Sequence, residues 1–502
     1  MDWFDAGNYE FARQVLQRGT AALYLVAFVS TFAQFPALLG ERGLLPVREF
    51  LQRRYSRTQP TIFRWHYSDR MLRLLCVAGA LAAASVVLGL PQAGPPWVPM
   101  LVFLAMWAIY LSIVSVGQTF YGFGWESLLL EAGFLVAFLG SNEVAPPLPI
   151  IALTWWLVFR LEFGAGMIKM RGDKSWKDLT ALHYHHETQP MPNPVSRFAH
   201  LLPRSVHKGE VLGNHFAQLV VPFFLFVPQP VATVAAAIII ATQLWLVITG
   251  NFAWLNFLTI VLAFSAVGDS VVGDHAVRWL LPWPADVAYP PTPPWFTAIV
   301  LAVSAVMVLL SWFPLRNLFS RRQLMNASFN RWHLVNAYGA FGSVTQERYE
   351  VIVEGTLAER PTDAAGWLEY EFKGKPGDPR RVPAQFAPYH VRLDWLMWFL
   401  ALGSPDNRWF EVFLHRLLEA DLPTLRLLRH DPFDGTPPNW VRARLYLYRF
   451  ATRAERREHG MWWMRQDAGL FVRPTGLPRN NEAGTTKLES RNRNDESMSD
   501  ET

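Results

Sequence analysis

Nine apolar stretches of near-spanning length divide the first two-thirds of the chain. A bilayer-crossing helix needs about 20 predominantly apolar residues. The stretches occupy residues 20–39, 72–90, 97–116, 124–140, 148–168, 214–228, 231–249, 253–268 and 295–315. We predict a polytopic α-helical membrane domain of about nine spans over residues 1–320, with large polar loops at 41–71 and 169–213. Two stretches, 214–228 and 253–268, are short, so the count falls to eight or seven if either is re-entrant.

The periodicity changes after Arg316. Alternating apolar and polar positions predict strands at 349–356, 367–373 and 440–450, and helical periodicity predicts amphipathic helices at 389–403 and 408–420. We expect a soluble C-terminal domain at 325–474 that is α+β or β-sandwich-like. Its first helix, which is rich in tryptophan, would pack in the domain core or lie on the bilayer surface, with the core favoured. Polar residues 475–502 are predicted to form a disordered tail.

Composition supports a membrane protein and excludes several classes of function. Of the 502 residues, 51% are hydrophobic and only 17% are charged, against about 25% charged in soluble proteins. Cys76 is the only cysteine, so this chain cannot contain an internal disulfide or a CxxC thiol relay. The basic residues lie beside predicted spans and do not indicate nucleic-acid binding. Abundant arginine and alanine favour a bacterial source, hence the inner membrane; a eukaryotic source would imply the endoplasmic reticulum membrane.

An odd number of spans would place the motif-bearing loops and the C-terminal domain on one side of the membrane. That face would combine residues 40–46, 118–126, 169–213, 214–215, 249–251 and everything after 316. The loops at 41–71 and 169–213 carry seven basic residues each, which the positive-inside rule assigns to the cytoplasm. Two considerations oppose this assignment. The basic residues could be present for function, and soluble domains of this size can cross the membrane regardless of their charge.

Charged residues in the apolar stretches indicate a polar interior. Glu126, Glu131, Arg160, Glu162 and Lys169 lie in or at the ends of the fourth and fifth stretches, where an unpaired charge costs at least about 2.5–3.5 kcal/mol. Glu131 and Arg160 reach similar depths in an antiparallel hairpin, at about 1.5 Å per residue. We therefore predict an ion pair between them. The pair would lock two helices together or line a cavity for a ligand.

The second polar loop contains the densest candidate chemistry. His183, His185 and His186, beside Glu187, could bind a metal or transfer protons. No HExxH motif is present, and a hydrogen-bonded structural loop is favoured. The run TQPMPNP at 188–194 must be extended, because each proline disfavours helix for itself and its predecessor. It would form a peptide-binding lip or a scaffold across the mouth of the bundle.

Several motifs spread over the chain are long enough to compare with known families. In the predicted membrane domain they are GERGLLP, FYGFGWESLLLEAGFL, RLEFGAGMIKMRGDKSWKDLTALHYHHETQPMPNP, NHFAQLVVPF and TGNFAWLNFLT. The C-terminal domain adds LVNAYGAFGSVTQERYEVIVEGT, WLEYEFKGKPGDPRR and APYHVRLDWLMWF. From about residue 20 to 455 the chain resembles the lipase maturation factor family of endoplasmic-reticulum membrane proteins. The resemblance implies a factor that helps secreted lipases fold and assemble into active dimers, with its functional surface on the lumenal side.

The chain also departs from this family. Members have Tyr where this chain has His186 and Asp where it has Glu126, and both changes keep hydrogen-bonding capacity. Animal members contain many cysteines, so any thiol-linked part of their action does not carry over to a chain with one. In a bacterium, other exported proteins could replace lipases as clients. The membrane domain is also distantly similar in architecture to the helical domain of vitamin K-dependent carboxylases.

We therefore predict a membrane-embedded, chaperone-like maturation factor for exported clients, by resemblance lipases, whose other partner is the lipid bilayer. No cofactor, metal or nucleic acid is predicted. The alternative is a membrane enzyme acting on a lipid or quinone-like substrate through His183, His185, Glu131 and Arg160. The candidate client- or ligand-binding residues are Trp125, Glu126, Lys169, Arg171, Asp173, Trp176, Asp178, His183, Tyr184, His185, Glu187, Gln189, Asn193, Asn214, His215 and Asn251.

Overall fold

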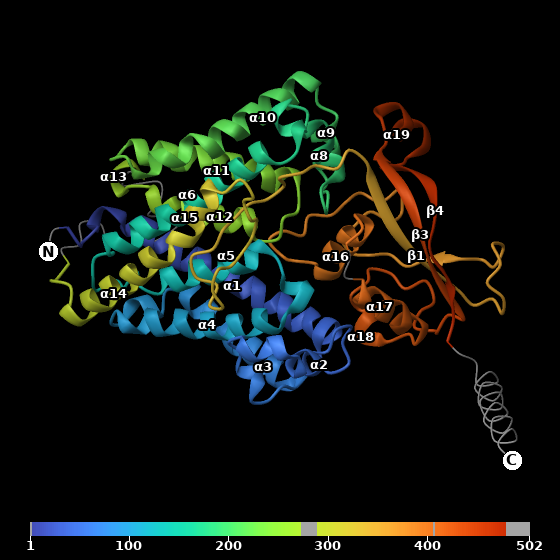
Figure 1. The fold of residues 1–502 in the computed structure, drawn as a ribbon, viewed down its shortest axis with the longest axis horizontal. Helices are drawn as coiled ribbons and strands as arrows, with labels where there is room; N and C mark the ends of the chain where they lie inside the picture. The colour runs from blue at the N-terminus through green and yellow to red at the C-terminus, as the bar shows by residue number, and fades with distance from the viewer. Residues whose placement is uncertain (1–2, 273–288, 405–406, 478–502) are drawn as a thin grey trace, which may run out of the picture.

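The N-terminal region is a bundle of helices (Figure 1). The computed structural model describes residues 3–272, 289–404 and 407–477. Six helical segments within these ranges have the length and apolarity needed to cross a bilayer. They are Gly7–Leu39, which contains α1 (Glu10–Leu39), then α3 (Asp69–Val87), α4 (Trp97–Val116), α6 (Leu148–Arg171), α11 (Val231–Thr249), and Pro294–Phe319, which joins α14 (Pro294–Leu310) to α15 (Trp312–Phe319). The chain is an integral membrane protein.

Nine spans are not confirmed, because three of the predicted stretches form only short helices. Residues 124–140 contain α5 (Gly124–Val136), whose 13 residues reach about 20 Å. Residues 253–268 contain α12 (Leu255–Ala263) and a 3-10 turn. Residues 214–228 divide between α10 (Arg204–Leu219) and a 3-10 helix, because Pro222 does not continue an α-helix. The apolar composition of α5 reflects burial inside the bundle, where nearly all its residues lie.

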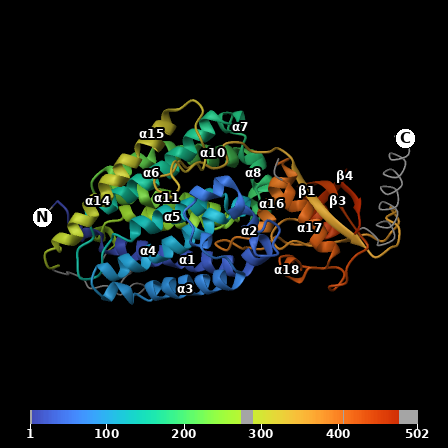
Figure 2. The same cartoon turned by 60° about the horizontal axis from the view of Figure 1, so that its bottom comes forward.

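Helix α1 runs through the bundle and contacts α3, α5 and α12; Figure 2 shows α3 and α4 beside it. Its first N–H groups, on Glu10 and Phe11, donate to the carboxylate of Asp269 at 3.0 Å. Asp269 is the first residue of α13 (Asp269–Val272). Its carboxylate satisfies two of the N–H groups that have no partner within the first turn of α1. At the periphery, only 28% of the apolar window of α3 and 17% of the final spanning segment are buried. These surfaces are available to lipid.

The two large polar loops are folded. The first contains α2 (Val47–Gln52) and two 3-10 turns. The second contains α7 (Lys174–Lys177), α8 (Leu182–Thr188), α9 (Ser196–His200) and the first half of α10. In Figure 1, α8 and α9 lie between the bundle and the C-terminal strands. The densest candidate chemistry is therefore at the junction of the two domains.

The C-terminal domain is an α+β unit, the first of the two predicted alternatives. In the described residues, β1 (Arg348–Thr356), β2 (Leu368–Glu369), β3 (Trp440–Phe450) and β4 (Trp463–Thr475) form one antiparallel sheet in the order β2-β1-β3-β4. Helix α16 (Arg392–Ala401) packs on β1 and α17 (Arg408–Leu418) packs on β3. Two short helices, α18 (Leu422–Leu425) and α19 (Arg453–His459), complete the domain.

The details of this domain confirm one expectation and correct another. Trp395 and Met397 of α16 are 2% and 0% exposed, so the helix packs in the core, as favoured. Strand β4 was not predicted, and it includes Thr475, the first residue of the predicted tail. A capping box that begins at Thr452 starts α19, and Gly460, with φ of 68°, ends it. The rest of the predicted tail, from 478 to 502, lies outside the described residues.

Candidate functional site

Helix α5 joins the membrane domain to the C-terminal domain through the fully buried Glu126. Nη1 of Arg392, at the start of α16, lies 2.6 Å from the Glu126 carboxylate, and the Tyr110 hydroxyl donates to the same carboxylate. Arg392 also donates to the carbonyl oxygen of Phe120 at 2.8 Å. Burial and the neighbouring Arg392 lower the pKa of His390 to about 3, so this imidazole is neutral beside the pair. Glu126 is thus a docking residue for α16.

The predicted ion pair between Glu131 and Arg160 is confirmed, and both side chains are buried. The other Glu131 oxygen accepts the Asn336 backbone N–H and side-chain amide at 2.9 Å, and the Tyr338 hydroxyl at 2.7 Å. Four donors fill the hydrogen-bonding capacity of a carboxylate. The geometry therefore favours a lock between α5, α6 and the segment before β1 over a cavity for a ligand.

Lys169, Trp176, Asn214 and His215 come together where α6, α7 and α10 meet. Nζ of Lys169 donates to Oδ1 of Asn214 and Oε1 of Gln218, both at 2.9 Å, and lies 4.5 Å from the centroid of the Trp176 ring. Nε2 of His215 lies 3.0 Å from the Trp176 carbonyl oxygen and donates to it. A buried ammonium is tolerated only when it is paired in this way. These four predicted residues fasten three helices.

The end of α6 and the residues after it are fastened to α15 and to the segment between α15 and β1. Arg171 donates to a carbonyl oxygen of α15 at 2.7 Å. The carboxylate of Asp173 accepts the N–H groups of Ser175 and Val344 at 2.9 and 3.2 Å. These hydrogen bonds, that of Ser175 first, outweigh partial burial and lower the pKa of Asp173. Asp178, by contrast, is exposed to solvent.

The proline segment is buried beneath the C-terminal domain. Gln189 and Asn193 are only 2% and 1% exposed. The Gln189 amide donates to the Thr249 carbonyl oxygen at 2.8 Å, and the Asn193 amide donates to Oε1 of Gln385 at 2.8 Å. Arg348 of β1 donates to the Gln189 carbonyl oxygen at 2.5 Å. Because its polar groups are paired within the chain, the segment fits a scaffold better than a peptide-binding lip.

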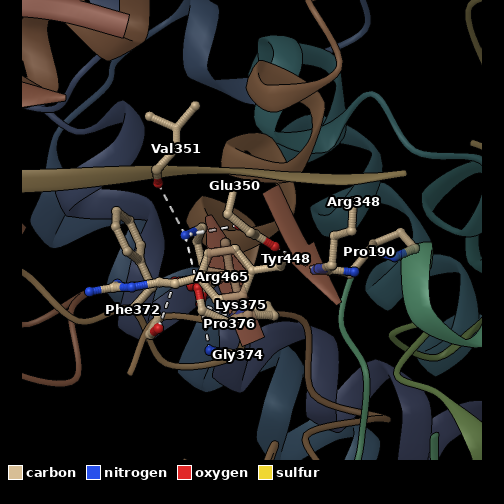
Figure 3. A network of polar contacts seen from close by, with 12 residues as sticks. Pro190, Arg348, Glu350, Val351, Phe372, Gly374, Lys375, Pro376, Tyr448 and Arg465 are labelled. Carbon is tan, nitrogen blue, oxygen red and sulfur yellow. Dashed lines mark hydrogen bonds and ion pairs between the residues drawn. The ribbon is translucent and has the colours of Figure 1, made fainter. Parts of the chain in front are cut away.

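A buried charge network behind this segment ties it to the sheet (Figure 3). Nη2 of Arg348 donates to the carbonyl oxygen of Pro190 at 3.1 Å and to Glu350 at 2.6 Å. Nζ of Lys375 lies 3.0 Å from the other Glu350 oxygen. Sequence reasoning missed this network. The available signal was a pair of opposite charges at i and i+2, which share one face of a strand.

Asn251 clamps the turn between α11 and α12 to the segment before α16. Its Oδ1 accepts the N–H groups of Phe386 and Ala387 at 2.7 and 2.9 Å, and its Nδ2 donates to the Ala384 carbonyl oxygen at 2.9 Å. Asn251 is 1% exposed. The polar loops thus meet the C-terminal domain directly, while the side of the membrane on which they lie stays a prediction.

Aromatic packing closes the same junction. Trp125 stacks on Phe123 with ring centroids 4.6 Å apart and meets Trp395 of α16 at 4.8 Å. It is 7% exposed. Edge and stacked arrangements at these distances stabilise aromatic pairs by about 0.5–1.5 kcal/mol each.

The residues of α8 point to different neighbours. His185 packs against Phe341, with ring centroids 5.3 Å apart, and burial lowers its pKa to about 3. Glu187 accepts the N–H of Phe450 at 2.7 Å, and burial raises its pKa. Nε2 of His183 is buried without a hydrogen-bond partner among the described residues, while Tyr184 is half-buried.

The four alternative catalytic residues form two separate groups. Among the described residues, no hydrogen bond or ion pair joins His183 or His185 to Glu131 or Arg160. Acid–base partners in an active site must come within hydrogen-bond reach of one reacting centre. This geometry gives the enzyme alternative no support.

The C-terminal domain carries an open cleft of about 500 Å³. Three of its lining residues are basic and four are apolar. The lining residues are Lys373, Arg381, Val382, Ala384, Phe386, Leu428 and Arg429. Two of them, Ala384 and Phe386, belong to the backbone that Asn251 holds. A smaller hollow of about 220 Å³ lies between the turn after α4 and helices α16 and α17.

Spanning helices docked through buried polar contacts onto an α+β domain define a polytopic membrane protein with a fixed extramembrane domain. The profile of the lipase maturation factor transmembrane domain matches residues 11–274, and that of the lipase maturation factor C-terminal domain matches residues 334–473. The chain belongs to the lipase maturation factor family.

Relatives match over nearly the whole chain. Lipase maturation factor 1 of Homo sapiens is 40% identical, with 94% of this chain and 89% of the relative aligned. Lipase maturation factor 2 of Gallus gallus is 30% identical, with 91% and 80% aligned. No solved structure matches. The family resemblance predicted from the motifs is confirmed, while the bacterial origin stays a prediction.

Proposed function

We propose that this protein is a membrane-embedded maturation factor that assists the folding or assembly of exported lipases. The names and near full-length alignment of its relatives support this function. The observation that carries it is the docking of a bilayer-spanning bundle onto an α+β domain through the buried contacts of Glu126, Arg392 and Asn251. Such docking holds a protein-binding surface at a fixed place beside the membrane, where an exported client emerges.

The client surface in this proposal is the cleft between Lys373 and Arg429. Its apolar lining includes Val382, which is 46% exposed, and three of its lining residues are basic. Apolar area in a concave site supplies binding energy, and surrounding charge supplies selectivity and association rate. The cleft therefore suits an incompletely folded segment that has apolar and acidic side chains. Most of the predicted loop residues act as the scaffold of this surface.

The test is Val382→Asp, which places a charge in the apolar lining of the cleft while leaving every hydrogen bond described above in place. In cells that lack the native gene, this variant should lower the specific activity of a secreted lipase without lowering the amount of lipase protein. The matched control is Leu422→Asp, because Leu422 is an exposed apolar residue of the same domain, 62% exposed, outside the cleft. Equal lipase activity with both variants would remove the cleft from the proposal.

The enzyme alternative predicts a different pattern. If His183 transferred a proton in catalysis, His183→Ala would abolish the activity of the protein, because general acid–base groups contribute about 10²–10⁴-fold. Under the maturation proposal, His183→Ala leaves lipase specific activity unchanged. A stoichiometric quinone in the purified protein would favour the enzyme.

We further infer that the loop face and the C-terminal domain lie on the non-cytoplasmic side of a bacterial inner membrane. Maturation of exported clients requires this side, and the family resemblance implies it. Some basic residues of the second loop then serve the fold: Lys169 and Arg171, for example, donate hydrogen bonds to residues of α10 and α15.

A further inference from the structure

Two helices of the second polar loop bring three metal-ligating side chains together. His186 lies on α8, and His207 and Glu210 lie three residues apart on one face of α10. Nδ1 of His207 is 2.8 Å from one Glu210 oxygen, and Nε2 of His186 is 3.8 Å from the other. One ligand atom from each residue lies within 4.8 Å of both others.

Both ring nitrogens of His207 face oxygen atoms that accept hydrogen bonds, although a neutral imidazole can donate only one. Its Nε2 is 3.2 Å from the His200 carbonyl oxygen, which can only accept. Its Nδ1 faces the Glu210 carboxylate, which also accepts when ionised. A neutral imidazole has a single N–H. Both contacts are therefore satisfied either by an imidazolium or by a cation held between Nδ1 and the carboxylate.

His186 distinguishes these alternatives. Its side chain is 2% exposed, and neither ring nitrogen has a hydrogen-bond partner among the described residues. The Glu210 oxygen that faces it is also buried without a hydrogen bond in the same part of the chain. Leaving a buried polar group unpaired is costly. Protonation of His207 gives no partner to Nε2 of His186 or to the Glu210 oxygen that faces it. A metal ion between the three residues would bind both of these atoms.

We propose that Nε2 of His186, Nδ1 of His207 and a carboxylate oxygen of Glu210 bind a divalent transition metal of the zinc type. Two imidazoles and one carboxylate suit zinc. The His200 carbonyl oxygen would accept the remaining N–H of His207 and fix its tautomer, a common arrangement around metal-bound histidine. Ligands of tetrahedral zinc lie about 3.4 Å apart, which falls between the 2.8 and 3.8 Å separations from the Glu210 oxygens to His207 and His186, so small side-chain adjustments suffice on binding.

The site would fasten α8 to α10. The residue after His186 is Glu187, which accepts the N–H of Phe450 in β3. A metal bound at His186 therefore stiffens the segment through which the loop contacts the sheet. Of the three histidines that the sequence offered as possible metal ligands, only His186 belongs to this group, and the other two ligands lie on α10.

The experiment uses the full chain in detergent, purified through an affinity tag without histidine. After EDTA treatment the protein is dialysed against Zn²⁺, and bound zinc is measured by mass spectrometry. One zinc per chain is expected. Co²⁺ should give the intense visible absorption of tetrahedral coordination, and Zn²⁺ should raise the unfolding temperature of the EDTA-treated protein.

His186→Ala and Glu210→Gln should each weaken zinc binding at least tenfold. The matched control is His66→Ala, since His66 is an exposed histidine of the first polar loop and its loss should leave one zinc bound. Substoichiometric zinc in the wild-type protein, meaning adventitious binding only, overturns the proposal. So does undiminished binding by His186→Ala. If the variants fail to fold, the wild-type stoichiometry and the Co²⁺ spectrum decide alone.

Discussion

Arg392→Met should weaken the junction between the two domains by about 3–5 kcal/mol, the cost of leaving a buried charge without its partner. The side chains of Arg392 and Glu126 are both 0% exposed. The matched control is Arg408→Met. Arg408 pairs with Glu49 at 3.3 Å across the same junction, but these side chains are 59% and 56% exposed, and such a pair contributes about 0–1 kcal/mol.

The assay is the rate at which trypsin releases the C-terminal domain from the detergent-solubilised protein. Cleavage follows the population of the opened state when opening and closing are fast. Because each 1.4 kcal/mol is a factor of ten, Arg392→Met should accelerate release roughly 150- to 5,000-fold. Arg408→Met should accelerate it about fivefold at most.

A double variant separates lost charge from lost packing. Adding Glu126→Gln to Arg392→Met removes the uncompensated carboxylate, so the double variant should release the domain more slowly than Arg392→Met alone. Equal release rates for the Arg392 and Arg408 variants would refute the reasoning. A double variant as labile as the single one would show that the buried charge is not the cause.

Three further predictions test the helices and the loops. Gly164→Ala should destabilise the protein, because a Cβ there would lie 2.6 Å from the Tyr338 carbonyl oxygen, whereas Gly209→Ala, with no atom within 4 Å, should stabilise helix α10 by about 0.5–1 kcal/mol; thermal unfolding distinguishes them. Folding lowers the pKa of Asp173. The contribution of its carboxylate to the free energy of unfolding is therefore complete above the unfolded-state pKa of about 3.9, and it is lost as the pH falls through the lower pKa of the folded state. Asp173→Asn should therefore unfold at a lower temperature than wild type at pH 7, and the difference should vanish in strong acid; a constant difference would contradict this. Lys177→Cys in a cysteine-free background should react with an impermeant thiol reagent in intact cells, and labelling only after permeabilisation would place the loop face in the cytoplasm.

Residue patterns predicted the long spanning helices, but they did not show that three of the apolar stretches form only short helices. Apolar composition is the same for a lipid-facing helix and for α5, which is buried among other helices. Depth counting did find the pair between Glu131 and Arg160, because helical rise is constant. Strand β4 escaped because Asp467 and Gly469 interrupt its alternation, where its pairing with β3 shifts register.

The sequence identified polar residues at the junction of the two domains, but it did not show which of them are exposed to a partner and which are buried. A polar side chain in a loop has the same sequence pattern whether it faces a client or a buried partner. Asn193 and Asn251 proved to be buried clamps. His186 was noticed, but its partners His207 and Glu210 lie on a helix that was divided between a predicted loop and a predicted span. Contacts between distant segments, which set these roles, leave no local pattern.

The pairing of Glu126 with Arg392 also sets an order of events during synthesis. The two residues are 266 positions apart in the chain. At about 5–20 residues per second, a ribosome needs roughly 10 to 50 s to reach the arginine after the glutamate has been made. Throughout that interval the carboxylate of α5 lacks its cation inside a nascent bundle. The membrane half can therefore reach its final packing only after Arg392 has been translated and α16 has folded back onto it.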